Sequence, residues 1–408
     1  MKEMKKANML RMEEALYLLL KQAKPLDDIE LVATECALGR VLATPQISTV
    51  DVPPLNNSAM DGYAVRIADL SVSTPLRVTQ RIPAGSIGQA LDAGTAARIF
   101  TGAPIPPHCD AVVMQENCTA ENGDVVIDKA PKAGENIRRA GEDIQSGAEV
   151  LSSGIKLRPQ EMGLLASVGL NRVPVYRKLR VATFFTGDEI VMPGQALRPG
   201  QIYNSNRFVL TGLLESLGCE VIDLGIVSDN FASTVEILQQ AAARSDLIVT
   251  SGGVSVGEED HVKAAVEHTG RLDLWRIAIK PGKPLAFGSA AGTSFFGLPG
   301  NPVSAFITFC LFVRPFILRS QGVVNVTTSY YPLPADFVWD KPDSKRREFL
   351  RARLVFSEDG SPVAQIYPHQ GSGVLTSCTW SDGLIEVKEG TSIQHGETVK
   401  FIPLNELF

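Results

Sequence analysis

The sequence has few of the side chains that most often bind metal ions or activate nucleophiles. Among 408 residues there are only five histidines, and His261 and His268 are seven positions apart. On a helix that spacing is roughly 10 Å, too far for one metal ion. The six cysteines are scattered, with no C-x-x-C pair and no zinc-type spacing. We therefore expect reduced thiols in a cytoplasmic protein, and neither a zinc site nor a disulfide framework.

The sequence also lacks an excess of basic residues and a long apolar run. Its 39 Lys and Arg stand against 45 Asp and Glu, a net charge of −6, which argues against a general nucleic-acid binder. The most apolar stretch, Phe306–Leu318, is interrupted by Arg314 and Pro315 and is shorter than the roughly 20 residues of a membrane helix. Met1–Lys24 favours an amphipathic helix over a secretory signal. These patterns predict no nucleic-acid partner and no membrane.

The spacing of apolar residues, Gly and Pro along the sequence predicts three structural regions. Residues 1–174 are composite, with a helical start and a β-rich subdomain at about 46–150, where short β-type runs alternate with Gly and Pro. In residues 175–325 predicted strands alternate with predicted helices, which indicates a parallel α/β domain with right-handed crossovers. Residues 326–408 are β-rich again and follow a stretch containing several prolines. The chain is therefore expected to be an α/β multidomain protein.

Glycines and acidic residues follow the predicted strands of the middle region. The four segments concerned are Thr186–Glu189, Asp229, Ser251–Asp260 and Leu298–Pro302. Ligands bind outside the carboxyl ends of parallel strands. Gly252 and Gly253 let backbone N–H groups approach an anion, and Asn301 and Pro302 suit the start of a helix. The pattern predicts a site for a phosphate-bearing ligand, with ordinary turns as the alternative.

A stiff basic turn lies between two predicted strands of the same region. Two prolines and a glycine restrict the backbone around Lys280 and Lys283, so this pair is expected to bind an anion. The alternative is a surface turn with solvated lysines. The nearby carboxylates would repel a phosphate. Mg²⁺ near Asp229 and Asp260, held by one or two carboxylates and the ligand phosphates, would reconcile the two charges.

Seven motifs together resemble one family. They are NNSAMDGYA (Asn56–Ala64), GENIRRAGEDI (Gly134–Ile144), TGDE (Thr186–Glu189), SGGVSVGEED (Ser251–Asp260), KPGKP (Lys280–Pro284), GLPGNPVS (Gly297–Ser304) and HQGS (His369–Ser372). In this order they are similar to the MoeA family of molybdopterin molybdenumtransferases, which also occurs as the E domain of gephyrin. The resemblance covers nearly the whole chain.

The resemblance implies a fold, a reaction and partners. The middle region would be a molybdopterin-binding domain of the MoaB/MogA type, and the last region a small β-barrel. The family releases AMP from adenylylated molybdopterin and inserts molybdate to give molybdenum cofactor, with Mg²⁺. It acts as a homodimer whose active sites lie at the subunit interface, and contacts with a molybdopterin adenylyltransferase and with molybdoenzyme chaperones are expected.

The resemblance also implies a role for individual positions. Catalytic roles fall on Asp61, Asp143, Glu189, Asp229 and Asp260, of which Asp260 matches the acid associated with phosphoanhydride cleavage. Adenylylated molybdopterin is expected at Thr101, Arg138, Gly252, Gly253, Ser255, Pro299, Asn301 and Pro302. Molybdate is expected at Lys280, Lys283, Ser304, Arg351 and Ser372. Two positions depart from the pattern, since Asn204 stands where Asp is expected and His261 where an aromatic residue is expected.

Two other functions fit parts of the sequence. A molybdopterin adenylyltransferase would need only the middle region, and the N-terminal motifs and C-terminal region argue against it. A non-catalytic scaffold of the gephyrin E-domain type would have no need of Lys280, Lys283 and Asp260 together.

Overall fold

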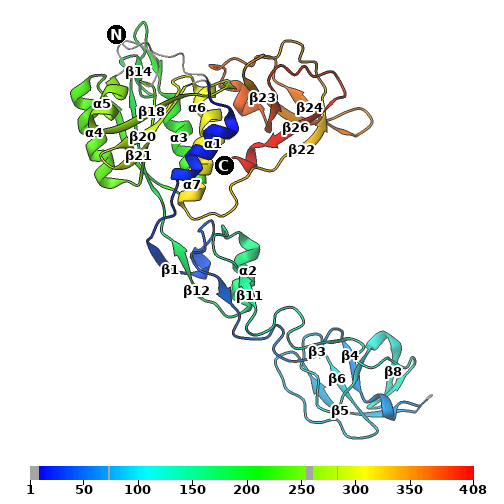
Figure 1. Ribbon diagram of the computed structural model, residues 1–408. Coiled ribbons are helices and arrows are strands. Elements are labelled where there is room, and N and C mark those ends of the chain that lie inside the picture. The colour runs from blue at the N-terminus through cyan, green and yellow to red at the C-terminus, as the bar shows by residue number, and fades with distance from the viewer. Residues whose placement is uncertain (1–8, 72–73, 254–260, 283) are drawn as a thin grey trace.

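The computed structural model describes residues 9–71, 74–253, 261–282 and 284–408, with the backbone alone for Leu274 and Trp275. The molecule is elongated (Figure 1). A central α/β domain contacts a C-terminal β domain at its side, and a long arm extends downward from its lower end in this view. The arm has two parts, a stem next to the central domain and a β-rich tip at the far end.

The central domain is built on a six-stranded sheet in the order β16-β13-β17-β21-β20-β18. Its strands are β13 (Arg180–Thr186), β16 (Glu220–Val227), β17 (Leu247–Ser251), β18 (Gly270–Arg276), β20 (Pro284–Ala290) and β21 (Thr293–Leu298). The first four strands of that order are parallel, but β20 is antiparallel to both of its neighbours. The prediction of a wholly parallel sheet was therefore wrong for β20. A two-residue turn, Ala291–Gly292 with φ of 48° and 85°, joins β20 to β21, and so short a loop permits only a hairpin.

Helices cover both faces of this sheet. Along β13, Phe184 and Phe185 point to opposite faces, and both are buried. α4 (Phe231–Arg244) and α5 (His261–Thr269) cover the face of Phe184. The face of Phe185 packs against α1 (Met12–Gln22), α3 (Ser205–Ser216), α6 (Pro302–Thr308) and α7 (Arg314–Ser320). The first helix of the chain, which lies within the predicted N-terminal region of residues 1–174, thus packs into the core of the central domain.

One long helix runs through the centre of this core. α6 continues through a π-helical segment, Phe309–Val313, into α7. Residues 302–320 are long and apolar enough to cross a membrane, but 89% of this stretch is buried inside the protein, as in a core helix. Arg314 and Pro315 interrupt the apolar run in the sequence, but they do not interrupt the helix. The wider π-helical turn accommodates the missing N–H of Pro315, and Arg314 donates to the Val326 carbonyl at 3.4 Å.

The C-terminal domain is a small sheet that curls into a barrel, as expected. Its strands are β22 (Tyr331–Pro334), β23 (Arg347–Phe356), β24 (Pro362–Ile366), β25 (Gly383–Val387) and β26 (Thr398–Pro403), with α8 (Thr376–Trp380) before β25. A bridge between Ala335 and Ala364 brings the β22 and β24 edges together. The short strand β19 (Ile279–Lys280), which leaves the central sheet, pairs in parallel with β23. The basic turn is therefore held by the C-terminal domain.

The arm consists of two small units. The stem pairs β1 (Ile29–Ala33) with β12 (Arg172–Tyr176) and β2 (Gln46–Ile47) with β11 (Glu149–Leu151), beside α2 (Pro159–Ser167). The tip is a sheet in the order β7-β4-β6-β5-β9-β8, with β3 (Asn57–Ser58) paired to β10 (Ile137–Arg138). The strands of the tip sheet are β4 (Gly62–Val65), β5 (Leu76–Ile82), β6 (Thr95–Ile99), β7 (Ala111–Met114), β8 (Cys118–Glu121) and β9 (Asp124–Ile127). Apolar side chains are buried on both of its faces.

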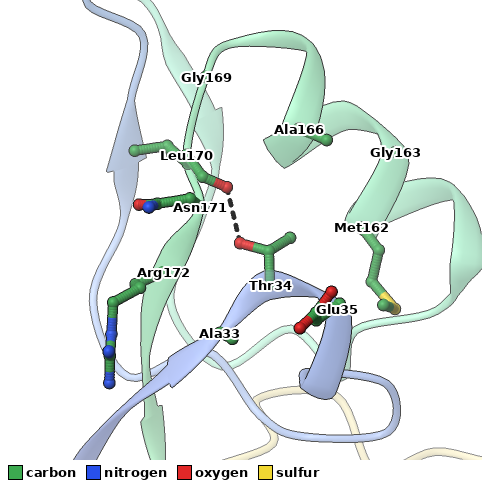
Figure 2. A pocket seen from close by; sticks show the side chains of 10 residues that line it. All are labelled: Ala33, Thr34, Glu35, Met162, Gly163, Ala166, Gly169, Leu170, Asn171 and Arg172. Carbon is green, nitrogen blue, oxygen red and sulfur yellow. Dashed lines mark hydrogen bonds between the residues drawn. The ribbon is translucent and has the colours of Figure 1, made fainter.

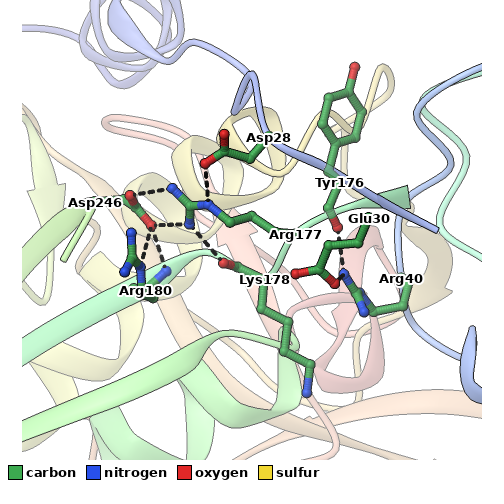
Figure 3. Close-up of polar contacts among 8 residues, drawn as sticks. All are labelled: Asp28, Glu30, Arg40, Tyr176, Arg177, Lys178, Arg180 and Asp246. Carbon is green, nitrogen blue, oxygen red and sulfur yellow. Dashed lines mark hydrogen bonds and ion pairs between the residues drawn. The ribbon is translucent and has the colours of Figure 1, made fainter. Parts of the chain in front are cut away.

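A network of charged residues joins the arm to the central domain (Figure 3). The chain passes between the two at residues 23–28 and again at residues 177–179. Arg177, from the second passage, forms ion pairs with Asp28 of the first passage and with Asp246 of the central domain. Arg40 of the stem donates to Glu30 and to the Tyr176 carbonyl beside them.

Candidate active site

A cavity of about 600 Å³ lies at the carboxyl edge of the parallel strands, where the central and C-terminal domains meet. Its walls come from the turns after β13, β17 and β21, from the basic turn after β19, and from two segments of the C-terminal domain. The lining residues are Glu189, Gly252, Gly253, Lys280, Pro281, Gly282, Pro284, Pro299, Gly300, Asn301, Ser304, Arg346, Gln370, Gly371 and Ser372. Three of the four predicted strand ends thus meet at this cavity, while the end that carries Asp229 does not line it.

The glycine turn after β17 is closely packed. Gly252 and Gly253 have φ of 96° and 62°, a conformation that residues with a Cβ rarely adopt. A Cβ on Gly253 would lie 2.6 Å from Val262 Cγ2 and 2.9 Å from Thr186 Oγ1. The packing therefore leaves no room for a side chain at Gly253, while the Gly252 N–H donates to the Leu298 carbonyl at 3.1 Å. Ser255 and Asp260, predicted on the same loop, lie outside the described residues.

Side chains beneath the cavity fix two of its turns relative to each other. Asn206 Nδ2 donates to Ser251 Oγ at 2.7 Å and to the Gly300 carbonyl at 2.8 Å. Ser251 Oγ in turn donates to the Pro299 carbonyl at 2.9 Å. The turns after β17 and β21 are thus joined by hydrogen bonds, as a preorganised site requires. Asn204, which departs from the family pattern, caps α3 by accepting from the Arg207 N–H at 3.1 Å.

The cationic wall of the cavity is made of residues from both domains. The Lys280 Nζ lies 2.7 Å from Oε1 of the buried Glu348. Arg346 lines the cavity beside it and forms an ion pair with Asp343 at 2.6 Å. Lys283, the other half of the predicted pair, lies outside the described residues. The described wall therefore carries one lysine and one arginine.

The start of α6 faces the same cavity. Pro302 occupies the first helical turn, as predicted, and Asn301 stands at the cap position without a side-chain capping bond. Ser304 is buried in that turn, 4% exposed. The Val303 N–H donates to the Ser372 carbonyl at 3.0 Å, which holds the C-terminal loop against the helix. Ser304 and Ser372, both predicted to bind molybdate, are thus brought together.

Arg351 lies behind the cavity wall and not on it. Its side chain is buried, and its nitrogens donate to Ser377 Oγ at 2.9 Å and to the carbonyls of Phe349, His369 and Gly371 at 3.2–3.5 Å. Burial lowers the pKa of this guanidinium to about 10. The structure therefore shows Arg351 holding the loop that carries Ser372, while the predicted direct contact with molybdate stays a prediction.

Four predicted residues lie on the arm, which the stem separates from the cavity in the same chain (Figure 1). Asp61, Thr101, Arg138 and Asp143 are all exposed there. Asp61 accepts hydrogen bonds from the backbone N–H and the hydroxyl of Thr101, both at 2.8 Å. These bonds, the backbone one first, lower the pKa of the Asp61 carboxyl. Within one chain, the predicted site is divided into two groups of residues.

Carboxylates are sparse in the described part of the cavity. Glu189 is the predicted acid that lines it, whereas Asp229 follows β16 without being a lining residue. Within the described ranges, no three His, Cys, Asp or Glu side chains cluster as a metal site would need. A cation here would have to take most of its oxygen ligands from a bound phosphate or from water.

A larger hollow of about 740 Å³ lies in the stem, between η1 (Thr34–Cys36) and the end of α2 (Figure 2). Its wall is mostly small or apolar, and its charged side chains are Glu35 and Arg172. Thr34 uses its hydroxyl to donate to the Leu170 carbonyl at 2.6 Å. The hollow contains none of the predicted site residues, and its chemistry does not suit an anion.

Several lining residues were not anticipated from the sequence, above all Arg346 and Gln370. Arg346 lies in the basic run Lys345–Arg347, which signals a cationic surface without showing which side chain faces the cavity. Arg347 beside it pairs instead with Glu13, Glu386 and Glu389. Gln370, from the HQGS motif, uses its side chain to bond the backbone of Arg351.

Family models match this chain over most of its length. They are the MoeA N-terminal region (domain I and II) at residues 10–169, a probable molybdopterin binding domain at residues 182–319, and the MoeA C-terminal region (domain IV) at residues 340–404. The first match covers α1 and most of the arm, and the other two cover the central and C-terminal domains.

Relatives and solved structures agree with these matches. The molybdopterin molybdenumtransferase of Haemophilus influenzae is 41% identical over 402 residues, covering 98% of this chain and all of the relative. The one from a Nostoc species is 41% identical over 308 residues, which is 73% of this chain and 71% of the relative. A crystal structure of the MoeA molybdopterin biosynthesis protein from Pyrococcus horikoshii superposes with a TM-score of 0.83 at 30% identity, over 97% of this chain and all of that one. The chain therefore belongs to the MoeA family.

Proposed function

We propose that this protein is a molybdopterin molybdenumtransferase, which inserts molybdate into adenylylated molybdopterin and releases AMP. The relatives from Haemophilus influenzae and Nostoc have that name. The observation that carries the proposal is one cavity that joins a closely packed glycine turn to a cationic wall. The turn suits a phosphoanhydride, and the wall suits a small dianion such as molybdate.

The division of roles within the cavity follows from its two walls. Gly253 would offer its backbone N–H to the phosphates, next to Pro299 and Asn301, while the Gly252 N–H donates to the Leu298 carbonyl at 3.1 Å. Lys280, Ser304 and Ser372 lie around the other side, where the oxyanion would bind. Because Ser372 and Arg346 come from the C-terminal domain, the central domain alone would make an incomplete anion site. That favours molybdate insertion over adenylyl transfer, the alternative that needs only the central fold.

We propose that Mg²⁺ binds in this cavity together with the phosphates of the substrate. Glu189 is the described carboxylate in the cavity, and one or two carboxylates suffice for Mg²⁺ when phosphate oxygens complete the set. Asp229 and Asp260 are the further ligands that the sequence predicts. The bound cation would offset charge on the phosphoanhydride, while Glu189 and the glycine turn orient it.

We also propose that the protein is a homodimer in which the arm of the partner completes the site. Asp61, Thr101, Arg138 and Asp143 are exposed on the arm and cannot reach the cavity of their own chain past the stem. An isologous pair with two shared sites would use each arm once. A cytoplasmic location is consistent with the six unpaired cysteines, and contacts with an adenylyltransferase and molybdoenzyme chaperones stay predictions.

Product analysis tests the function directly. Purified protein would be incubated with adenylylated molybdopterin, molybdate and Mg²⁺, and AMP and molybdenum cofactor would be measured over time. We expect the wild-type protein to release AMP only when molybdate is present, and the Lys280→Ala variant to release none. Transfer of AMP from ATP to molybdopterin would support the adenylyltransferase alternative, and binding without turnover would support a scaffold.

A further inference from the structure

We propose that Glu348 is a positioning residue that sets both described cations of the cavity wall, and that Arg346 is an oxyanion contact beside Lys280. The inference rests on the function proposed above, because it concerns the anion that the same cavity would bind. It assigns to the C-terminal domain the task of orienting the anion site.

Glu348 is a buried carboxylate with Oε2 hydrogen-bonded and Oε1 in an ion pair that lacks hydrogen-bond geometry. It lies on β23 with 1% of its surface exposed. Oε1 lies 2.7 Å from Lys280 Nζ, while Oε2 accepts from Trp339 Nε1 and from the Asp343 N–H, each at 2.9 Å. Such burial is tolerated only when hydrogen bonds and an opposite charge compensate the lost hydration. The carboxylate is therefore fixed, and it fixes its partners.

Lys280 is held by this carboxylate while it faces the cavity. The pairing of β19 with β23 sets Lys280 opposite Glu348 in register, and 41% of the lysine side chain is exposed. An ammonium has three N–H donors, and the ion pair with Glu348 leaves at least two of them for a ligand. A free lysine loses about 2 kcal/mol of rotamer entropy when it is ordered. Pairing with Glu348 removes part of that loss before the anion arrives.

Arg346 is set by the same carboxylate through Asp343. The bond from the Asp343 N–H to Glu348 fixes the turn, and Asp343 Oδ2 then accepts from Arg346 Nε at 2.8 Å and lies 2.6 Å from its Nη2. Asp343 Oδ1 accepts from the Arg346 N–H at 3.0 Å. One edge of the guanidinium is thus held. Nη1, which has no hydrogen bond to any described residue, is left for the cavity.

A comparison within the same sheet separates this arrangement from an ordinary structural ion pair. Glu386 on β25 also pairs with two cations, Arg347 at 3.0 Å and Lys400 at 3.6 Å, and neither of them lines the cavity. Glu348, in contrast, acts on both described cations that do.

The test is calorimetric titration of the full-length protein with molybdate, with Glu386→Gln as the matched control. In Glu348→Gln the amide oxygen would still accept from Trp339 Nε1 and the Asp343 N–H. The amide NH₂ would then face the ammonium of Lys280, and two donors cannot pair. We expect molybdate binding to weaken about tenfold and the molybdate KM to rise with kcat nearly unchanged at saturation. Glu386→Gln should bind as wild type does. Wild-type binding in Glu348→Gln would overturn the positioning role.

A double-mutant cycle and a second variant complete the test. If Glu348 acts through the cations, adding Glu348→Gln to Lys280→Ala should weaken binding by less than it does alone, whereas full additivity would contradict the inference. If Glu348→Gln does not fold, Arg346→Gln decides, because its side chain is partly exposed. It should weaken molybdate binding, and Arg346→Lys should restore part of it. An unchanged affinity in Arg346→Gln would overturn the contact. Wild-type protein that binds no molybdate would instead refute the proposed function.

Discussion

Arg177 binds Asp246 with both terminal nitrogens, at 2.7 and 2.8 Å, and its Nε donates to Asp28 at 2.7 Å (Figure 3). Asp28 and Arg177 lie on the two passages of the chain between arm and central domain, and Asp246 immediately precedes β17. One guanidinium thus connects both passages to the central domain. Arg177 thus helps to hold the arm, which carries Asp61, to the central domain.

Replacing Asp246 should loosen the junction. Asp246→Asn removes the charge that Arg177 and the Arg180 N–H bind, and we expect a loss of about 2 kcal/mol in the free energy of unfolding. Urea denaturation measures the loss, and small-angle X-ray scattering should show a wider range of arm positions. Arg172→Gln, an exposed arginine of the stem, is the control and should change stability by less than about 0.5 kcal/mol. Equal effects of the two variants would contradict the role of Arg177 and Asp246.

The same contact predicts a dependence on pH. Burial raises the pKa of the Asp246 carboxyl. The hydrogen bonds from Arg177 and the Arg180 N–H, together with the charges of both arginines, lower it by more than burial raises it. The net pKa therefore lies below the usual value of 3.8. A depressed folded-state pKa stabilises the protein above the unfolded pKa and loses that effect as the pH falls through the folded value. The stability difference between wild type and Asp246→Asn should therefore stay constant from about pH 7 to 5 and shrink below about pH 4. A difference that grows in acid would refute this.

The glycine turn can be tested with one added methyl group. Gly253→Ala would place a Cβ against Val262 and Thr186, in a left-handed backbone that already disfavours alanine. We expect loss of AMP release, with a destabilisation of about 1–3 kcal/mol. Gly94→Ala, also at positive φ but with nothing within 4 Å of the new Cβ, isolates the backbone strain and should keep its activity. Normal turnover by Gly253→Ala would argue against ligand binding at this turn.

Mixed dimers test whether two chains share each site. Asp61→Asn damages the arm and Lys280→Ala damages the cavity, so each homodimer should be inactive. A heterodimer purified with two different tags should have about half of wild-type activity, because one of its sites takes the intact arm and the intact cavity from different chains. An inactive heterodimer would show that each site is formed within a single chain.

Local sequence patterns predicted the elements around the site well. Helix α5 has the predicted bounds, His261–Thr269, and Gly218 follows α3 with positive φ, as a helix terminator should. The glycines after β17 and the start of the helix at Pro302 lie at the positions that the alternating strand and helix patterns predicted. These features depend on residues close together in sequence, which is why a single sequence carries them.

Features that depend on distant contacts could not be predicted in this way. Arg351 and Arg346 are both arginines of one basic stretch, and only tertiary packing buries the first and brings the second to the cavity. The strand β20 was predicted, but its antiparallel direction was not, because its turn, Ala291–Gly292, lacks the usual Asn-Gly signal. The separation of Asp61 from the cavity follows from the length of the stem, which no local motif encodes.

The position of α1 in the core has a consequence for synthesis on the ribosome. Ala15 and Leu19 are buried in the same cluster as residues of α7, near position 317, and β1 finds its partner β12 only about 140 positions later. The tip, whose strands all fall between residues 57 and 138, can fold as soon as it emerges. The first helix must wait, with its apolar face uncovered, until three quarters of the chain has been made. During that interval it is a natural target for chaperones that recognise exposed apolar helices.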